Sequence, residues 1–218
     1  MTLEELKNNR EIEEYYKRGD AILGTLGYTD HSTAHALVVA KNAGNILEWY
    51  HYTKHDIELV RIAAYLHDIG NCINRHHHAE YGALLANDIL RSTDLSVKDR
   101  TDIVASIANH DESTGIAFDP ISAALIIADK SDVRRNRVRV KPKSQFDIHD
   151  RVNYAVTGSN LKYEEEKNRL ALNLQIDESI CTMYDYFEIF LDRMMMCRRA
   201  AEVLNSSFKL TVNGHKVL

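Results

Sequence analysis

The stretch that decides the fold runs from Arg61 to Gly70 and reads Arg-Ile-Ala-Ala-Tyr-Leu-His-Asp-Ile-Gly. Its first residues predict an apolar helix, which leads directly into His67 and Asp68. Gly70 can adopt the left-handed conformation that ends a helix. Two polar side chains that can bind a metal therefore stand in the last turn of a mostly buried helix, where burial costs free energy unless a partner compensates. Candidate partners elsewhere in the chain are His35, His78, His110 and Asp129.

Helical spacing of apolar residues continues on both sides of this stretch. Within residues 32–50, for example, Val39, Ala43 and Ile46 repeat at helical intervals. The chain has only two prolines and nine glycines, which suits long helices. The predicted helices cover residues 2–26, 32–50, 53–70, 78–90, 97–110, 121–136 and 148–155.

The pattern changes near residue 160. Leucine and isoleucine alternate along residues 169–176, which predicts the second strand of an antiparallel hairpin that begins at residue 161. Asp177 is the expected cap of a long helix over residues 178–204, and a short strand follows at 208–212. We therefore expect a mainly α protein. Its helical body, residues 1–158, carries the metal site, and residues 159–218 add a small antiparallel β-sheet and a closing helix packed as part of the same unit.

Composition limits the class of protein. Of the 218 residues, 44% are hydrophobic and 27% are charged, which is ordinary for a soluble globular protein. No apolar run approaches a membrane span, and the acidic, amphipathic N-terminus is not typical of a signal peptide, so we expect a cytoplasmic protein. The net charge of −5 argues against nonspecific binding to nucleic acid. Formation of a homo-oligomer is left open.

The candidate ligands are histidines and aspartates, and this choice narrows the metal. Imidazole nitrogen and carboxylate oxygen suit divalent Fe, Mn, Zn, Co or Ni. None of the three cysteines belongs to the group, which argues against a structural zinc site. Helices that each bring one or two ligands to the core of a bundle are an established way to build a metal site. The sequence therefore predicts a divalent transition metal, as one ion or two.

The order of these residues resembles the signature of the HD superfamily of metal-dependent phosphohydrolases. The matching residues are His35 in His-Ala-Leu-Val-Val, His67-Asp68 in Leu-His-Asp-Ile-Gly, and Asp129 in Ile-Ala-Asp-Lys. The resemblance covers roughly residues 28–140. It implies an HD-type helical bundle, a divalent metal held by these four residues, and hydrolysis of a phosphate ester, often of a nucleotide. Family members with two metals have two further histidines, and His78 and His110 stand where those are expected.

The resemblance also implies a mechanism, in which the metal lowers the pKa of bound water toward neutrality and the nucleophile attacks phosphorus. Asp68 would bridge two ions if both are bound. Lys130 and Arg134 are four residues apart on one predicted helix, so we expect them to share a face and bind the substrate phosphate. Asp68 and Lys130 are thus the predicted catalytic residues. The alternative is that the basic residues between 134 and 143 are an ordinary solvated face.

Departures from the family restrict the substrate. Asn71 replaces the lysine of the branch that cleaves cyclic dinucleotides, and Gly-Tyr-Pro occurs nowhere, which argues against that activity. The sequence contains no synthetase-like domain, which argues against a bifunctional alarmone enzyme. The expected substrate is a nucleotide or a related small phosphorylated metabolite. Two other interpretations stay open: a non-catalytic ligand-binding, sensory or interaction protein, and a di-iron oxygenase.

Overall fold

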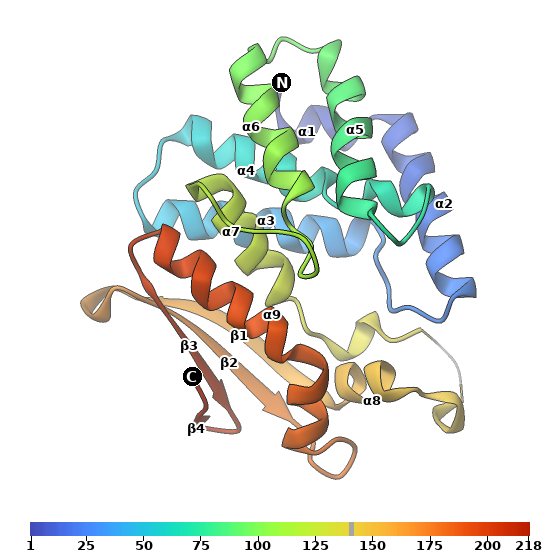
Figure 1. Cartoon of the computed structure of the whole chain (residues 1–218), viewed down its shortest axis with the longest axis vertical. Coiled ribbons are helices and arrows are strands. Elements are labelled where there is room, and N and C mark those ends of the chain that lie inside the picture. Colours follow the sequence, from blue (N-terminus) through green and yellow to red (C-terminus); the bar gives the residue numbers. More distant parts are fainter. Residues whose placement is uncertain (140–141) are drawn as a thin grey trace.

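The computed structural model describes residues 1–139 and 142–218 and confirms a mainly α architecture (Figure 1). Lys141, part of the predicted basic segment, lies outside the described residues. The helices are α1 (Leu3–Leu6), α2 (Arg10–Thr25), α3 (Thr33–Trp49), α4 (Lys54–Leu66), α5 (His78–Arg91), α6 (Val97–Ala108), α7 (Pro120–Lys130), α8 (Ile148–Ala155) and α9 (Met183–Val203). The strands are β1 (Val156–Glu164), β2 (Arg169–Ile176), β3 (Ser207–Val212) and β4 (His215–Lys216). None of the helices in these described ranges is both long enough and apolar enough to cross a membrane.

The first predicted helix is interrupted, since α1 and α2 replace the single helix expected over residues 2–26. Asn9 causes the break. Its side-chain oxygen accepts hydrogen bonds from the backbone N–H groups of Glu11 and Ile12, so it caps a new helix. A local side-chain contact thus overrides the helical periodicity at this point.

Helices α3, α4 and α7 pack against one another and form the centre of the helical body. α3 buries Ala36, Ala40 and Ala43 on one side, and these small side chains permit the close approach of the helices. α7 is enclosed by its neighbours, and every residue from 121 to 128 is buried. This packing explains why α7 has an almost uninterrupted apolar sequence. It also fixes the ends of the three helices, from which several predicted ligands project.

Gly70 has a different role from the predicted one. α4 ends at Leu66, and residues 69–72 form a 3-10 turn in which Gly70 does not have a positive φ angle. A Cβ atom at Gly70 would instead lie 2.0 Å from the carbonyl oxygen of His78 and 2.4 Å from the backbone nitrogen of Gly82. The turn therefore packs directly against the start of α5, which requires glycine. The prediction of a left-handed cap at Gly70 is wrong.

α7 is shorter than predicted, and this changes the position of Arg134. The helix ends at Lys130 rather than near residue 136, and Arg134 has an extended backbone. The prediction that Lys130 and Arg134 share a helix face is therefore wrong. Asp132 accounts for the difference, because its buried carboxylate contacts the side chains of His35 and Arg134 and holds the chain away from a helical path.

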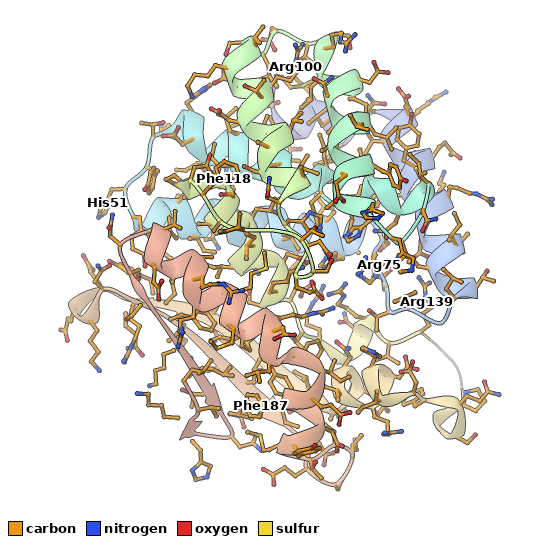
Figure 2. The ribbon with its side chains drawn as sticks, in the orientation of Figure 1. His51, Arg75, Arg100, Phe118, Arg139 and Phe187 are labelled. Carbon is orange, nitrogen blue, oxygen red and sulfur yellow. The ribbon has the colours of Figure 1, made fainter. Side chains whose placement is uncertain are left out.

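Arginines in the basic segment after α7 bind other parts of the protein. Arg137 is buried and donates hydrogen bonds to the carbonyl oxygen of Asp30 at 2.9 and 3.0 Å. Arg139 donates to the carboxylate of Asp20 on α2 at 2.6 Å (Figure 2). These contacts draw the segment toward the end of α2. Arg137 and Arg139 are therefore not part of a solvated basic face.

The C-terminal sheet is mixed, whereas we predicted a wholly antiparallel one. β1 and β2 form the expected antiparallel hairpin, and β3 and β4 are also antiparallel. β3, however, runs parallel to β2, with Leu172 beside Leu210. The physical reason is α9, which follows β2, crosses the sheet and returns the chain to the end where β2 began (Figure 1).

α9 connects the sheet with the helical body. It begins at Met183 with Thr182 as its cap, rather than after Asp177. Its buried side chains include Tyr186 and Phe190, and the helix packs against α7 and β3. α9 therefore lies against α7, the helix that carries Asp129 near its end.

Candidate metal centre

The predicted ligands converge where five helices begin or end. His35 lies in the first turn of α3, His67 and Asp68 follow α4, and Asp129 lies in the last turn of α7. His78 is the first residue of α5, and His110 follows α6. All of these side chains are buried except that of Asp129, which is partly buried. The fold thus brings together residues that are up to 94 positions apart in the sequence, from 35 to 129.

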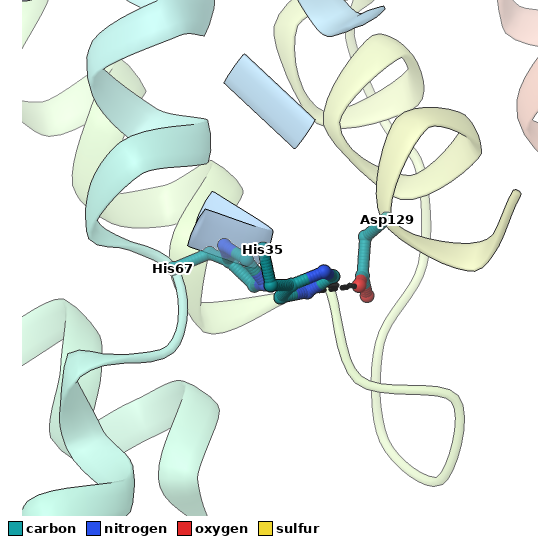
Figure 3. A group of neighbouring side chains, drawn as sticks. All are labelled: His35, His67 and Asp129. Atoms are coloured by element: carbon teal, nitrogen blue, oxygen red, sulfur yellow. Dashed lines mark ion pairs between the residues drawn. The ribbon is translucent and has the colours of Figure 1, made fainter. Parts of the chain in front are cut away.

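His35, His67 and Asp129 form one compact group (Figure 3). Oδ1 of Asp129 lies 3.3 Å from Nε2 of His35 and 3.7 Å from Nε2 of His67. Oδ2 of Asp68 lies 3.2 Å from Nε2 of His67 and 3.7 Å from Nε2 of His35. Two ligand atoms that are each about 2.1 Å from one ion stand about 3 Å or slightly more apart. The spacing of these four donor atoms is therefore close to that required by one divalent cation.

A shared arrangement orients the four histidines. In each ring, Nδ1 contacts a protein oxygen, and an Nδ1–H that donates to oxygen leaves the lone pair on Nε2. The oxygens are those of the Asp132 carboxylate for His35 and of the backbone carbonyls of Ala64, Arg75 and Ile107 for His67, His78 and His110. In all four rings, Nε2 is therefore the nitrogen that can bind a metal ion.

Three of these potential metal-binding atoms make no hydrogen bond with any described residue. Nε2 of His35, Nε2 of His67 and Oδ2 of Asp68 are buried and make no hydrogen bond within the part of the chain that the structure describes. An unsatisfied buried polar atom costs about 1–3 kcal/mol. A divalent cation among these atoms would compensate for all three, so the residues present fit such an ion.

Asp68 directs its two carboxylate oxygens at different histidines. Oδ2 faces His35 and His67, whereas Oδ1 lies 3.6 Å from Nε2 of His78. The ring of His110 is close to both sides, with its centroid 4.9 Å from that of His67 and 5.0 Å from that of His78. His67, Asp68 and His110 form a second compact group, and His78 stands just outside it. This geometry is suited to a carboxylate shared between two ions.

The charged groups of the cluster stabilise one another. Burial would raise the pKa values of Asp68 and Asp129, but His67 and Lys130 respectively hold them well below their usual range. Burial would lower the pKa of His67, but the two carboxylates raise it to about 10. The pKa of His110 is lowered to about 3, mainly by burial and next by the charge of the neighbouring His67. A cation that binds must displace the proton of His67, so metal binding releases protons.

Two residues that the sequence reasoning missed position the predicted ligands. Asp132 lies 2.7 Å from Nδ1 of His35, and the Nδ2 group of Asn71 donates to Oδ1 of Asp68 at 2.8 Å. Asp132 follows Asp129 by three positions, which is a helical interval and could have drawn attention to it. Asn71 was noted only for its departure from one branch of the family, yet it is buried and orients Asp68.

Lys130 and Arg134 lie in different surroundings. Nζ of Lys130 is 2.8 Å from Oδ2 of Asp129 and 2.7 Å from Oε2 of Glu112. Burial would lower the pKa of Lys130, but these two carboxylates raise it, so the amine stays charged. Arg134 instead pairs with Asp132 and lines a separate hollow beside β1. Glu112 lies in the loop after α6, and no pattern in the sequence predicts its contact with Lys130.

A cavity of about 280 Å³ opens over the cluster. Lys130 lines it, whereas Arg134 does not. Four of the predicted ligands also line it, namely Asp68, His78, His110 and Asp129. His31 is a further lining residue, and its Nδ1 contacts the carbonyl oxygen of Thr29 at 2.7 Å. A small molecule in this cavity would therefore contact the cluster directly.

Comparison with known proteins identifies the class to which this helical bundle and its buried histidine and aspartate cluster belong. The HD domain model matches residues 32–172, which is more than half of the chain. The protein therefore belongs to the HD domain family, a family of metal-dependent hydrolases. It is also similar to an uncharacterized protein of Methanocaldococcus jannaschii, with 29% identity over 191 residues that cover 77% of this chain and 73% of that protein.

Proposed function

We propose that this protein is a phosphohydrolase that uses a divalent transition metal and water to cleave a phosphate ester of a nucleotide or a related small metabolite. The observation that carries this proposal is the set of buried atoms on His35, His67 and Asp68 that make no hydrogen bond among the described residues, beside the carboxylate of Asp129. In the proposal these four residues hold one ion. Fe, Mn, Zn, Co and Ni are all compatible with nitrogen and oxygen ligands of this kind.

A second ion would be held by His78 and His110, with Asp68 shared between the two. The orientation of the Asp68 carboxylate supports this assignment, because its two oxygens face different histidines. A divalent cation at such a site lowers the pKa of water and neutralises charge on phosphoryl oxygens. The contribution of Asn71 is to hold Asp68 in the orientation that both ions need.

Lys130 contributes a fixed positive charge beside the reacting group. Its ammonium is held between Asp129 and Glu112 and lines the cavity, where it can contact a phosphoryl oxygen that gains charge in the transition state. The raised pKa of Lys130 means that the amine does not donate its proton near neutral pH. We therefore assign Lys130 an electrostatic role and not that of a general acid.

The cavity supports a small and strongly polar substrate. Its volume of about 280 Å³ is just below the range for small-molecule sites, which begins at about 300 Å³. Its walls include Arg75, Lys130, Arg137 and Arg193. Cationic walls around buried carboxylates and imidazoles fit a phosphorylated metabolite bound together with metal ions.

The test combines elemental analysis with turnover of a panel of phosphate esters, including nucleotides. Asp68→Ala should lose bound metal and reduce turnover by at least about 100-fold, since it removes a ligand of both proposed ions. Asp102→Ala is the matched control, because it removes a carboxylate that, among the described residues, pairs with Lys98 alone, on the surface of α6. Circular dichroism should report the same helical content in both variants.

Three results would contradict the proposal. Unchanged turnover in the Asp68→Ala variant would remove Asp68 from the reaction. A wild-type protein that contains metal but cleaves no ester of the panel would favour a ligand-binding protein, and oxidative chemistry that depends strictly on iron would favour an oxygenase.

A further inference from the structure

The cavity over the cluster adjoins a second cavity of about 350 Å³. Both are lined by Arg75, His149 and Arg193, which therefore surround the junction. Arg75 lies in the loop before α5 (Figure 2), His149 lies on α8, and Arg193 lies on α9. Segments that are far apart in the sequence thus bring nitrogen-bearing side chains to one place.

Arg75 carries a positive charge that no carboxylate of the described residues balances at ion-pair distance. Its Nη1 donates to Oδ1 of Asn71 at 3.3 Å, and its Cζ lies 5.4 Å from the centroid of the Tyr28 ring. Both partners are neutral. They hold a half-buried guanidinium in position while most of its N–H groups remain available, an arrangement suited to an anionic ligand.

Arg193 offers a second set of donors at the junction. Its Nε donates to Oε1 of Glu112 at 2.9 Å, and its Cζ lies 5.0 Å from the centroid of the Phe190 ring. Only one edge of the guanidinium is used by these contacts. The remaining nitrogens can therefore bind a ligand without breaking the ion pair that holds the side chain.

Acidic side chains around the outer cavity are held by contacts of their own, and none of them pairs with Arg75 among the described residues. Glu80 pairs with His77 at 3.4 Å, and Oδ2 of Asp111 accepts a hydrogen bond from the hydroxyl group of Ser113. Glu112 lies between two cations, one of which is Arg193. Of the two arginines at this junction, Arg193 is paired with Glu112, whereas Arg75 has no ion pair among the described residues, so a ligand can match its charge.

We propose that Arg75 and Arg193 bind a second phosphoryl group, so that the preferred substrate carries a chain of at least two phosphoryl groups. This inference rests on the proposed function, which puts the reacting phosphoryl group beside Asp68. Asn71 then sets the position of the second group, since a single amide joins Asp68 to Arg75 through two hydrogen bonds. The second anion would therefore lie one group farther out, toward the outer cavity.

The test measures the binding of inorganic phosphate and inorganic diphosphate by calorimetry at a fixed concentration of free Mn²⁺, with the metal content of the protein checked afterwards. Wild type should bind diphosphate at least about 10-fold more tightly than phosphate. Arg75→Gln and Arg193→Gln should each reduce this preference by about 10-fold and change the affinity for phosphate by less than about 2-fold. Arg91→Gln removes a charge at the exposed end of α5 and should leave the preference unchanged.

Equal affinity of the wild type for the two anions would overturn the inference, and so would an unchanged preference in the Arg75→Gln variant. Because the readout is binding, this result is separate from that of the turnover panel. A protein that cleaves phosphate esters but lacks the preference for diphosphate would refute only the second phosphoryl site. A protein that has the preference but no turnover would refute only the hydrolase.

Discussion

Substitution of Asp132 tests how the proposed histidine ligands are held. The Asp132 carboxylate lies 2.7 Å from Nδ1 of His35 and so keeps Nε2 directed at the cluster. Asp132→Asn preserves the size of the side chain but removes its charge, and its amide can present an N–H group to His35 instead of an oxygen. We expect this variant to fold and to bind metal more weakly.

Two independent estimates give the size of the effect. A hydrogen bond that involves a charged group contributes about 1.5–3 kcal/mol, and Asp132 is buried, so solvent does not weaken the contact with His35. Since about 1.4 kcal/mol corresponds to a 10-fold change in an equilibrium constant, metal affinity should fall about 10- to 100-fold. Loss of a group that orients a metal-binding histidine typically has a cost of the same size, about 10- to 100-fold.

The assay is a competition titration of the metal against a chromophoric chelator, with folding checked by circular dichroism. Glu48→Gln is the control, because Glu48 is on the same helix as His35 and pairs with Arg61 far from the cluster. An Asp132→Asn variant that is folded and binds metal within about 2-fold of wild type would refute the role assigned to this carboxylate.

Three further predictions concern stability. Gly70→Ala should lower the free energy of unfolding by about 3 kcal/mol, because its Cβ would overlap the backbone of α5. Gly27 has a positive φ and open space around it, so Gly27→Ala should lower the free energy of unfolding by only about 1–2 kcal/mol. Equal losses in denaturant titrations of the two variants would contradict this explanation. Removal of metal by a chelator should lower stability by about 2.7 kcal/mol relative to protein at a metal concentration 100 times the Kd, and an unchanged melting temperature would contradict a metal bound only by the folded state. Burial would raise the pKa of Glu112, but Lys130 lowers it below the value of 4.5 expected in the unfolded chain, so the ion pair should stabilise the protein above pH 4.5 and lose its effect as the pH falls further. Glu112→Gln should therefore be less stable than wild type at pH 7, with a difference that shrinks in acid, and a difference independent of pH would argue against this ion pair.

Local patterns in the sequence were sufficient to predict most helices. α5, at His78–Arg91, and α8, at Ile148–Ala155, differ by at most one residue from the predicted ranges. The predicted ligands converge because they stand at or near helix ends, and the packing of α3, α4 and α7 brings those ends together. Periodicity reports which face of a helix is buried, and so it indicates which residues of each helix meet the core.

Contacts between distant segments were beyond the reach of such patterns. The direction of β3 depends on the path of α9 over the sheet, and the need for glycine at position 70 depends on the carbonyl group of His78. The early end of α7 depends on the contact between Asp132 and His35, which are 97 residues apart. In each case a tertiary contact, and not the propensity of the local sequence, determines the structure.

Asn71 gives the two halves of the proposed site a common support. One end of its planar amide donates to Asp68 and the other accepts from Arg75, so an event that fixes one neighbour also restricts the other. Thermodynamic linkage makes such an effect reciprocal. If an anion that orders Arg75 strengthens metal binding by a given factor, the metal must strengthen anion binding by the same factor. Because Asn71 contacts both residues, we expect release of the substrate to weaken metal binding. We also expect binding of the metal to strengthen binding of the substrate.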